Sequence, residues 1–333
     1  MNKKLNVALV GCGAVAEYYH LPVLQRMPEY EIKYLVDLSK NRAESVMKRF
    51  RLSSKVETKY TKILDDDQLD AVLILTPPTF HKEQIFLAAE AGKAVFCEKP
   101  LSMNTQDAKD IIDVCERNGV KLLPGYQMRF DGKFSKIKEM IEKKMFGSLI
   151  GGQGLHFANA FEWPSVSKFQ IDEQKGGGAL FEMMHFVDLA TWFFGKALSM
   201  TASIFQKKKK SSIDDTANLH LTFENDVSVA LSIGWNTITV NSFTVYGTEG
   251  YLRALSDSKK LQYHAKNFLA QQPILIQPNH SVSPFQDELL HFYKTIMKDT
   301  SPIVTPEEII QNAKIIESAY NESNKNKTII LEE

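Results

Sequence analysis

Lys99 is the first residue whose type and position suggest chemistry. It stands in Glu98-Lys99-Pro100, directly after the apolar run Ala94–Cys97, which has the pattern of a buried parallel strand. Open α/β sheets bind their ligands at the carboxyl ends of such strands. A lysine there can stabilise the negative charge of an alkoxide as it forms. We therefore predict Lys99 as a catalytic residue, with Glu98 supporting the strand end or a cofactor ribose.

His185 and Glu182 form the second chemical feature. They lie three residues apart in a glycine-led apolar stretch that we expect to form one helix continuing to Phe194, so that one helical face carries both side chains. A histidine titrates near neutral pH, and the pair suits general acid/base work on a hydroxyl group. The same spacing occurs among metal ligands in helical bundles, but no further ligands are evident and no metal is predicted. His185 and Glu182 thus join Lys99 as predicted catalytic residues.

A glycine-rich turn follows the first apolar run, Leu5–Val10. The turn comprises Gly11, Cys12, Gly13, Ala14, Val15 and Ala16, which gives G-x-G-x-x-A between a strand and a helix. In this pattern the first glycine permits a tight turn, the second lets the backbone approach a pyrophosphate, and the last small residue lets the helix pack on the strand. The helix N-terminus offers its N–H groups to the phosphates. These residues predict a dinucleotide site.

Asp37 ends the second apolar run, 26 residues after Gly11. An acidic residue at about this distance receives the adenosine ribose hydroxyls and repels a 2′-phosphate. The position favours NAD over NADP, although Lys40 and Arg42 lie close enough in the sequence to pair with a phosphate. The alternative is that Asp37 only starts the turn into the next helix.

Thr76, Pro77 and His81 follow another apolar run, Ala71–Leu75. They are predicted to contact the cofactor, since they also stand beyond the carboxyl end of a parallel strand. For His81 the alternative is a surface position at the start of a helix.

The spacing of apolar runs predicts the elements that position these residues. From 5 to 125, short apolar runs alternate with amphipathic stretches such as 79–92 and 104–118, which indicates βαβ units and a parallel sheet. Later segments alternate with a period of two, which indicates antiparallel strands. These segments are 198–206, 216–223, 226–236 and 240–247. The predicted fold class is α/β, with a Rossmann domain over 1–125 and an α/β domain with a large, mainly antiparallel open sheet over 126–333.

Composition argues against several classes of function. The 40 basic and 40 acidic side chains cancel, so no overall field attracts nucleic acid or anionic membranes, and neither is predicted as a partner. No apolar run reaches the roughly 20 residues that a membrane-spanning helix needs. The cysteines at 12, 97 and 115 are interpreted as free thiols in a reducing compartment. We expect a cytoplasmic protein, and we interpret the lysines at 207–210 as a solvated hairpin tip rather than a phosphate site.

Three further residues are candidates for substrate binding. Arg129 would hold a phosphate or carboxylate, Trp163 would stack on a sugar face, and Asp188 would bind substrate one helical turn after His185. Each has a structural alternative, which is packing for Arg129, a loop anchor for Trp163 and an ordinary helix position for Asp188. For Arg129 we prefer packing slightly.

Taken together, these motifs resemble the Gfo/Idh/MocA oxidoreductases, the family of glucose–fructose oxidoreductase and inositol dehydrogenase. The likeness spans nearly the whole chain and includes Gly125 with Arg129, and also Asp214-Asp215-Thr216-Ala217. The resemblance implies that Lys99 and His185 sit by the nicotinamide and the reacting carbon. It also implies that the sheet of the second domain forms an oligomer interface, so we expect a homodimer or homotetramer.

One position departs from the commonest pattern of that family. Its members often carry an aspartate four residues before the histidine, whereas Glu182 lies three before His185 and Met183-Met184 fill the gap. The glutamate form is similar to a branch found in surface-polysaccharide and amino-sugar pathways. The departure leaves open whether Glu182 takes the role of the aspartate or only orients His185.

The predicted function is NAD(P)-dependent hydride transfer between nicotinamide and a hydroxyl or ketone carbon of a sugar, cyclitol or nucleotide-sugar. Two alternatives use the same scaffold. One is an NAD-dependent lyase or glycosidase that oxidises its substrate only transiently. The other is a non-catalytic dinucleotide-binding sensor. The substrate itself depends on side chains whose convergence in space cannot be read from their spacing.

Overall fold

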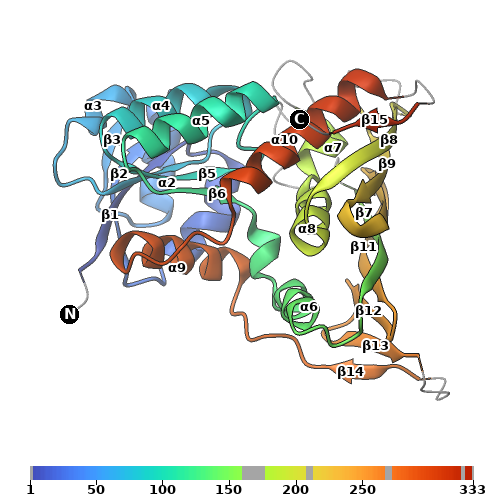
Figure 1. The fold of residues 1–333 in the computed structure, drawn as a ribbon. Coiled ribbons are helices and arrows are strands. Elements are labelled where there is room, and N and C mark those ends of the chain that lie inside the picture. The colour runs from blue at the N-terminus through green and yellow to red at the C-terminus, as the bar shows by residue number, and fades with distance from the viewer. Residues whose placement is uncertain (1–2, 160–176, 208–212, 267–271, 324–326, 332–333) are drawn as a thin grey trace. The chain divides into compact units, whose positions relative to one another are not determined.

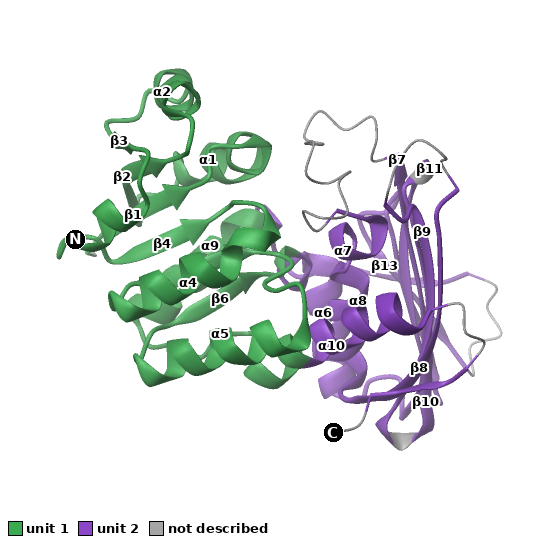
Figure 2. Cartoon of the chain, turned by 90° about the horizontal axis from the view of Figure 1, so that it is seen from above, with its two compact units in different colours: residues 1–127, 164–167, 285–310 green, residues 128–163, 168–284, 311–333 purple. Residues whose placement is uncertain are grey.

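The computed structural model of the chain describes residues 3–159, 177–207, 213–266, 272–323 and 327–331. They fall into two compact units (Figures 1 and 2). The first contains residues 1–127 and 285–310, and the second contains the described residues of 128–284 and those from 311 onward. We expected a single division at residue 125. The chain in fact returns to the first unit over residues 285–310.

Among the described residues, six strands form the sheet of the first unit, in the order β3-β2-β1-β4-β5-β6. All their pairings are parallel, which confirms the predicted Rossmann architecture. The strands are β1 (Leu5–Val10), β2 (Tyr30–Val36), β3 (Lys55–Glu57), β4 (Ala71–Ile74), β5 (Ala94–Glu98) and β6 (Leu122–Gly125). The strand order reverses between β1 and β4, and ligands of open α/β sheets bind at such a switch point.

Helices cover both faces of this sheet, with α4 and α5 side by side on one face and α9 on the other (Figure 1). The helical segments that precede or follow its strands are η1 (a π-helical turn, Ala16–His20), α1 (Leu21–Leu24), α2 (Lys40–Arg49), α3 (Thr61–Leu64), η2 (Pro78–Phe80), α4 (His81–Glu90), α5 (Thr105–Arg117), η3 (Gln127–Phe130) and α9 (Pro284–Met297). Helix α9 buries Leu289, Phe292 and Tyr293 in the same hydrophobic cluster as Leu5 and Leu9 of β1. This apolar burial is the physical reason that residues 285–310 belong to the first unit.

The second unit is built on a larger sheet with the order β14-β13-β12-β11-β7-β10-β9-β8-β15. Its described strands are β7 (Leu149–Asn159), β8 (Ala197–Phe205), β9 (Thr216–Phe223), β10 (Val227–Gly234), β11 (Asn236–Gly247), β12 (Gly250–Leu255), β13 (Leu261–Ala265), β14 (Ile274–Ile276) and β15 (Ile329–Ile330). The pairings between these described strands are antiparallel apart from β7 with β10. The expected mainly antiparallel sheet is confirmed.

Strand β7 lies at the centre of this sheet and was not expected from the sequence. Its glycines at 151, 152 and 154 have low β-propensity, so the sequence does not indicate a strand there. The structure explains two of them, because a Cβ atom on Gly152 would lie 2.6 Å from Phe194, and one on Gly154 would lie 2.8 Å from both Leu231 and Phe186. These glycines let a helix pack closely on the strand.

The helices of the second unit are α6 (Gly132–Glu142), α7 (Ala179–Glu182), α8 (His185–Phe194), the short η6 (Glu224–Asp226) and α10 (Pro306–Glu322). The expectation of one unbroken helix through Glu182 and His185 was wrong. Helix α7 ends at Glu182, Met183 and Met184 form a turn, and α8 begins at His185. The two side chains therefore do not share one face of a continuous helix.

None of the helices in the described residues combines the length and the apolar character needed to cross a bilayer.

Candidate active site

The glycine turn after β1 has the geometry of a dinucleotide loop. Gly11 has a φ of 97°, and a Cβ atom there would lie 2.9 Å from the Leu75 carbonyl group, so the turn excludes every other residue. A Cβ atom on Gly13 would meet no protein atom within 4 Å. Protein packing therefore does not demand glycine at 13. The close approach of a ligand to the backbone does account for it, and the loop fits a bound pyrophosphate.

The rest of the turn agrees with the predicted steric roles. Ala16 is fully buried at the start of η1, whereas Ala14 and Val15 are half-buried. The Cys12 thiol is buried, and burial, with the charge of Asp37, raises its pKa to about 12. Cys12 therefore stays protonated at neutral pH and is not a nucleophile.

Asp37 ties the end of β2 to the glycine turn. Its carboxylate accepts hydrogen bonds from the backbone N–H groups of Cys12, at 3.0 Å, and Ser39, at 2.8 Å. Arg42 reaches the same carboxylate at 3.3 Å, while the Arg42 side chain stays 57% exposed. Asp37 thus both starts the turn into α2 and lies at the cofactor loop, so the two interpretations of the sequence do not exclude each other.

His81 is not a surface residue, although it begins α4. Its side chain is fully buried, with Nδ1 2.9 Å from the Pro100 carbonyl oxygen and Nε2 2.8 Å from that of Thr76. Burial lowers the pKa of His81, which favours a neutral ring that donates to one of the two carbonyls at a time. His81 therefore joins the segments that follow β4 and β5, next to half-buried Thr76 and Pro77.

Glu98 and Lys99 stand at the carboxyl end of β5, as predicted. Glu98 Oε1 lies 2.7 Å from His20 Nε2, and Glu98 Oε2 accepts the backbone N–H of Lys99 at 3.1 Å. Burial opposes ionisation of Glu98, but the His20 hydrogen bond and the neighbouring charges outweigh it and lower the pKa of the carboxyl. A Cβ atom on Gly125 would lie 3.2 Å from Glu98, so Gly125 makes room for this carboxylate on β6.

Sequence reasoning missed His20. The residue lies 78 positions before Glu98, and no local pattern links the two. Only the parallel sheet brings the end of η1 next to the end of β5.

In the second unit, His185 is 5% exposed at the start of α8, and Glu182 is half-buried at the end of α7. A second imidazole lies nearby, since the ring centroids of His156 and His185 are 6.5 Å apart. His156, on β7, is 6% exposed and stacks on Phe186 at 4.6 Å. Sequence reasoning missed His156 along with its glycine-rich strand.

Asp214 anchors the start of α7. Its carboxylate accepts the Leu180 N–H at 3.0 Å and the Tyr320 hydroxyl at 2.8 Å, and its carbonyl accepts the Ala179 N–H at 3.0 Å. Gly178, with a φ of 135°, leaves the space that Asp214 fills. Burial raises the pKa of the Asp214 carboxyl. The doublet Asp214-Asp215 was noticed in the sequence as part of a motif, but its contact with the Glu182 helix was not.

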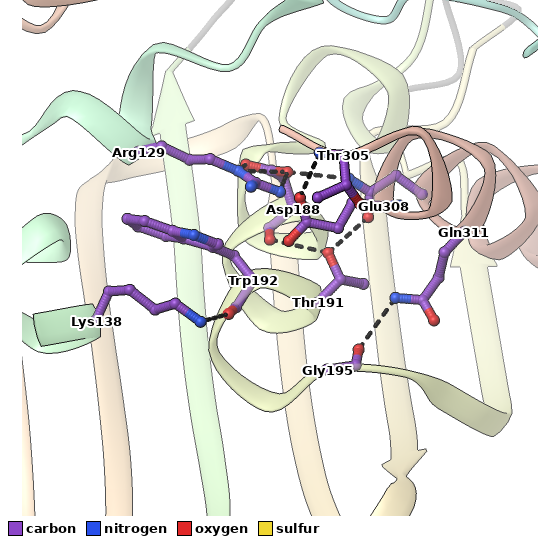
Figure 3. A network of polar contacts seen from close by, with 10 residues as sticks. Arg129, Lys138, Asp188, Thr191, Trp192, Gly195, Thr305, Glu308 and Gln311 are labelled. Atoms are coloured by element: carbon purple, nitrogen blue, oxygen red, sulfur yellow. Dashed lines mark hydrogen bonds and ion pairs between the residues drawn. The ribbon is translucent and has the colours of Figure 1, made fainter. Parts of the chain in front are cut away.

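Arg129 and Asp188 form a buried ion pair (Figure 3). Both side chains are 0% exposed, with Arg129 Nη2 2.7 Å from Asp188 Oδ1 and Arg129 Nε 3.0 Å from Oδ2. Asn312 of α10 donates to Asp188 at 3.0 Å and accepts from Thr191 at 2.8 Å. The geometry supports the packing alternative for Arg129, and it gives Asp188 a structural role beyond that of an ordinary helix position. A direct contact of either with substrate stays a prediction, and it requires this pair to open.

The remaining expectations concern Trp163, the lysine run, the cysteines and metal binding. Trp163 lies outside the described residues, as do the lysines at 208–210. The three cysteines are buried free thiols, as predicted. In the described part of the chain, no cluster of three or more histidine, cysteine, aspartate or glutamate side chains is arranged to hold a metal ion.

Comparison with known proteins identifies the family. Residues 5–126 match the oxidoreductase family with an NAD-binding Rossmann fold, and residues 134–253 match the GFO/IDH/MocA C-terminal domain. The chain belongs to the Gfo/Idh/MocA oxidoreductase family. The resemblance seen in the motifs is thereby confirmed, and so is the prediction of an enzyme of the oxidoreductase class.

Relatives of this Gfo/Idh/MocA protein match it along most of its length. An uncharacterized oxidoreductase of Bacillus subtilis, YrbE, is 25% identical over 96% of the chain and 94% of its own length. The scyllo-inositol 2-dehydrogenase (NADP(+)) IolW of the same organism is 23% identical over 98% of the chain and 96% of its own length. A structure of levoglucosan dehydrogenase in complex with NADH and L-sorbose has a TM-score of 0.89 at 20% identity and covers both chains in full. That structural likeness shows the shared fold.

Proposed function

We propose that this oxidoreductase transfers a hydride between a nicotinamide cofactor and a hydroxyl or ketone carbon of a sugar, cyclitol or nucleotide-sugar. The observation that carries the proposal is the glycine turn at 11–16, where Gly13 leaves space that no protein atom uses. The names of relatives support the substrate class, because IolW is named for an inositol and the levoglucosan dehydrogenase structure holds L-sorbose.

When bound, the nicotinamide supplies the hydride acceptor for oxidation and the hydride donor for reduction. His185 takes the proton of the substrate hydroxyl as the alcohol is oxidised, and it returns a proton to the oxygen in the reverse direction. Lys99 donates a hydrogen bond to the same oxygen and stabilises its negative charge. Glu182, at the end of α7, orients the turn that leads into His185.

We further propose that NAD is preferred to NADP. The Asp37 carboxylate lies against the glycine turn, where it would repel a 2′-phosphate. Arg42 beside it would attract such a phosphate, but its charge is partly balanced by Asp37. The names of similar proteins include both cofactors, since IolW is named for NADP(+) and the levoglucosan dehydrogenase structure is a complex with NADH.

A homo-oligomer formed through the larger sheet also remains our proposal. Along β9 the side chains that point away from the buried core include exposed Asn218 and His220, whereas Leu219 and Leu221 are buried. Light scattering on the purified protein would measure the assembly directly.

The experiment that tests the function is absorbance at the NADH band during turnover on a panel of sugars, cyclitols and nucleotide-sugars. A dehydrogenase forms NADH in proportion to oxidised product. Product without net NADH would instead indicate a lyase or glycosidase, and binding of the cofactor without any product would indicate a sensor.

The role of His185 is tested in the same assay with His185→Ala. Turnover should fall by ~10²–10⁴ while NADH still binds, because general acid/base groups contribute about this factor. His280→Ala is the matched control, since His280 is exposed and lies outside the helices and strands. Near-wild-type turnover of His185→Ala would end the acid/base proposal.

A further inference from the structure

We propose that His20 is a positioning residue that acts through Glu98 to hold Lys99 in place at the carboxyl end of β5. The inference rests on the catalytic role proposed above for Lys99. It assigns a purpose to a buried histidine that neither the sequence motifs nor the proposed proton transfer uses.

The hydrogen bond between His20 and Glu98 has a defined direction. His20 Nε2 lies 2.7 Å from Glu98 Oε1, and the pKa of Glu98 is lowered, so the carboxyl is ionised at neutral pH. A carboxylate can only accept, and therefore Nε2 carries the proton and donates it. The ring also makes T-shaped contacts with Phe96 and Phe285, whose ring centroids lie 5.4 and 5.5 Å away.

Glu98 in turn restrains the backbone of Lys99. Its other oxygen, Oε2, accepts the backbone N–H of Lys99 at 3.1 Å. Gly125 of β6 packs so closely that a Cβ atom there would lie 3.2 Å from both the Cα and the Oε2 atoms of Glu98. The carboxylate is thus bonded at one oxygen to His20 and at the other to the Lys99 backbone, with little space to move.

The other ring nitrogen of His20 separates this role from simple packing. Nδ1 is buried and has no hydrogen-bond partner among the described residues. Burying such a polar atom without a partner destabilises the fold, and a phenylalanine or methionine of similar size would avoid that cost among these aromatic rings. An imidazole at this position is therefore explained by its Nε2 bond to Glu98 rather than by the space it fills.

Loss of the bond should displace Lys99. Without His20, the side chain of Glu98, only 13% exposed, loses its charged hydrogen bond and must turn toward water or take up a proton. Either response changes Glu98 Oε2, which accepts the hydrogen bond from the Lys99 backbone N–H. A displacement of about 1 Å at a catalytic group can lower the rate ~10²-fold.

The test compares His20→Phe with His20→Gln in the full-length protein. Phenylalanine fills the site without a donor, whereas the glutamine amide places an N–H near the position of Nε2. We expect kcat to fall ~10²-fold in His20→Phe and to recover to within ~10-fold of wild type in His20→Gln. KM for the substrate and the NADH dissociation constant, from fluorescence titration, should change less than ~3-fold. Equal kcat in the two variants would overturn the proposal.

A second readout needs no cofactor. An amine-acylating reagent labels Lys99 in the cofactor-free protein, and peptide mass spectrometry measures the labelling rate. This rate should change at least ~3-fold in His20→Phe but not in His20→Gln. If His20→Phe fails to fold, Glu98→Gln keeps the size of the side chain and removes its charge. It should show the same fall in kcat, and wild-type kcat in that variant would also overturn the proposal.

Lys99→Ala separates this inference from the proposed function. If Lys99→Ala keeps wild-type turnover, the catalytic role of Lys99 fails and the inference fails with it. If Lys99→Ala is inactive while His20→Phe keeps its kcat, only the positioning role of His20 fails.

Discussion

The Arg129–Asp188 pair allows a quantitative prediction. Replacing Asp188 by leucine leaves the Arg129 guanidinium at 0% exposure without its carboxylate. Breaking a buried ion pair from one side costs about 3–5 kcal/mol, because an uncompensated charge stays buried. Asn312 also loses the acceptor of its 3.0 Å hydrogen bond. For a unit of this size, about 3–5 kcal/mol corresponds to a fall in Tm of roughly 6–20 °C.

The double variant Arg129→Met, Asp188→Leu makes the prediction specific. A buried pair replaced by apolar side chains of similar volume is often neutral in stability, so the double variant should be more stable than Asp188→Leu alone. Asn312 still lacks its acceptor, which leaves a deficit of about 1–3 kcal/mol relative to wild type. The coupling energy between the two positions is then obtained from the double-mutant cycle.

Tryptophan fluorescence is a suitable assay for this cycle. The sequence has three tryptophans, at 163, 192 and 235, and none lies in residues 1–127 or 285–310. Trp192 and Trp235 are buried in the second unit, so their fluorescence reports the unfolding of that unit and avoids the mixed transitions expected of a two-unit chain. Trp192 also lies close to the pair, with the Arg129 guanidinium 5.3 Å from its ring centroid. Asp188→Leu within about 1 kcal/mol of wild type would refute the reasoning. A stable double variant that no longer binds substrate would instead support the substrate roles of these two residues.

Three further predictions concern the first unit. Gly11→Ala should destabilise the free protein by several kcal/mol, because φ is positive and an added Cβ atom would clash with the Leu75 backbone. Gly13→Ala should leave the Tm nearly unchanged and weaken NADH binding ~10-fold or more. Calorimetry would measure the two Tm values and fluorescence titration the two NADH dissociation constants, and equal effects of the two variants would contradict this reasoning. Asp37→Ser should release Arg42 and shift the ratio of NADP to NAD affinity by ~10-fold or more toward NADP, and an unchanged ratio of dissociation constants would contradict our assignment. The pKa of Glu98 is lowered from 4.5 in the folded state, so its contribution to stability is fully present above pH 4.5 and is lost as the pH falls through the lowered value. Melting curves of wild type and Glu98→Gln should therefore converge at acid pH, and a constant difference would count against the His20 pair.

Much of the first unit could be predicted because its signals are local. The run Leu5–Val10 is strand β1 to the residue, and Gly11 takes the positive φ that its place in the motif requires. In the second unit the segment 216–223 is strand β9, since one of its faces is buried and polarity alternates with it. The helix that carries His185 was predicted less well, because Met183 and Met184 have good helix propensity and their sequence contains no sign of the turn.

By itself, the sequence determined those features whose causes lie within a few residues. A tight turn needs glycine at 11, a buried strand needs a continuous apolar run, and Lys99 follows such a strand directly. The tertiary structure alone decided the pairings between distant segments. These pairings join residues that are 59 or more positions apart. They are the contact of His20 with Glu98, the contacts of Asp188 with Arg129 and Asn312, and the packing of α9 on the first sheet. The physical reason is that a buried charge or apolar face needs a partner, but the partner is selected by the packing of whole elements and not by neighbours in the chain.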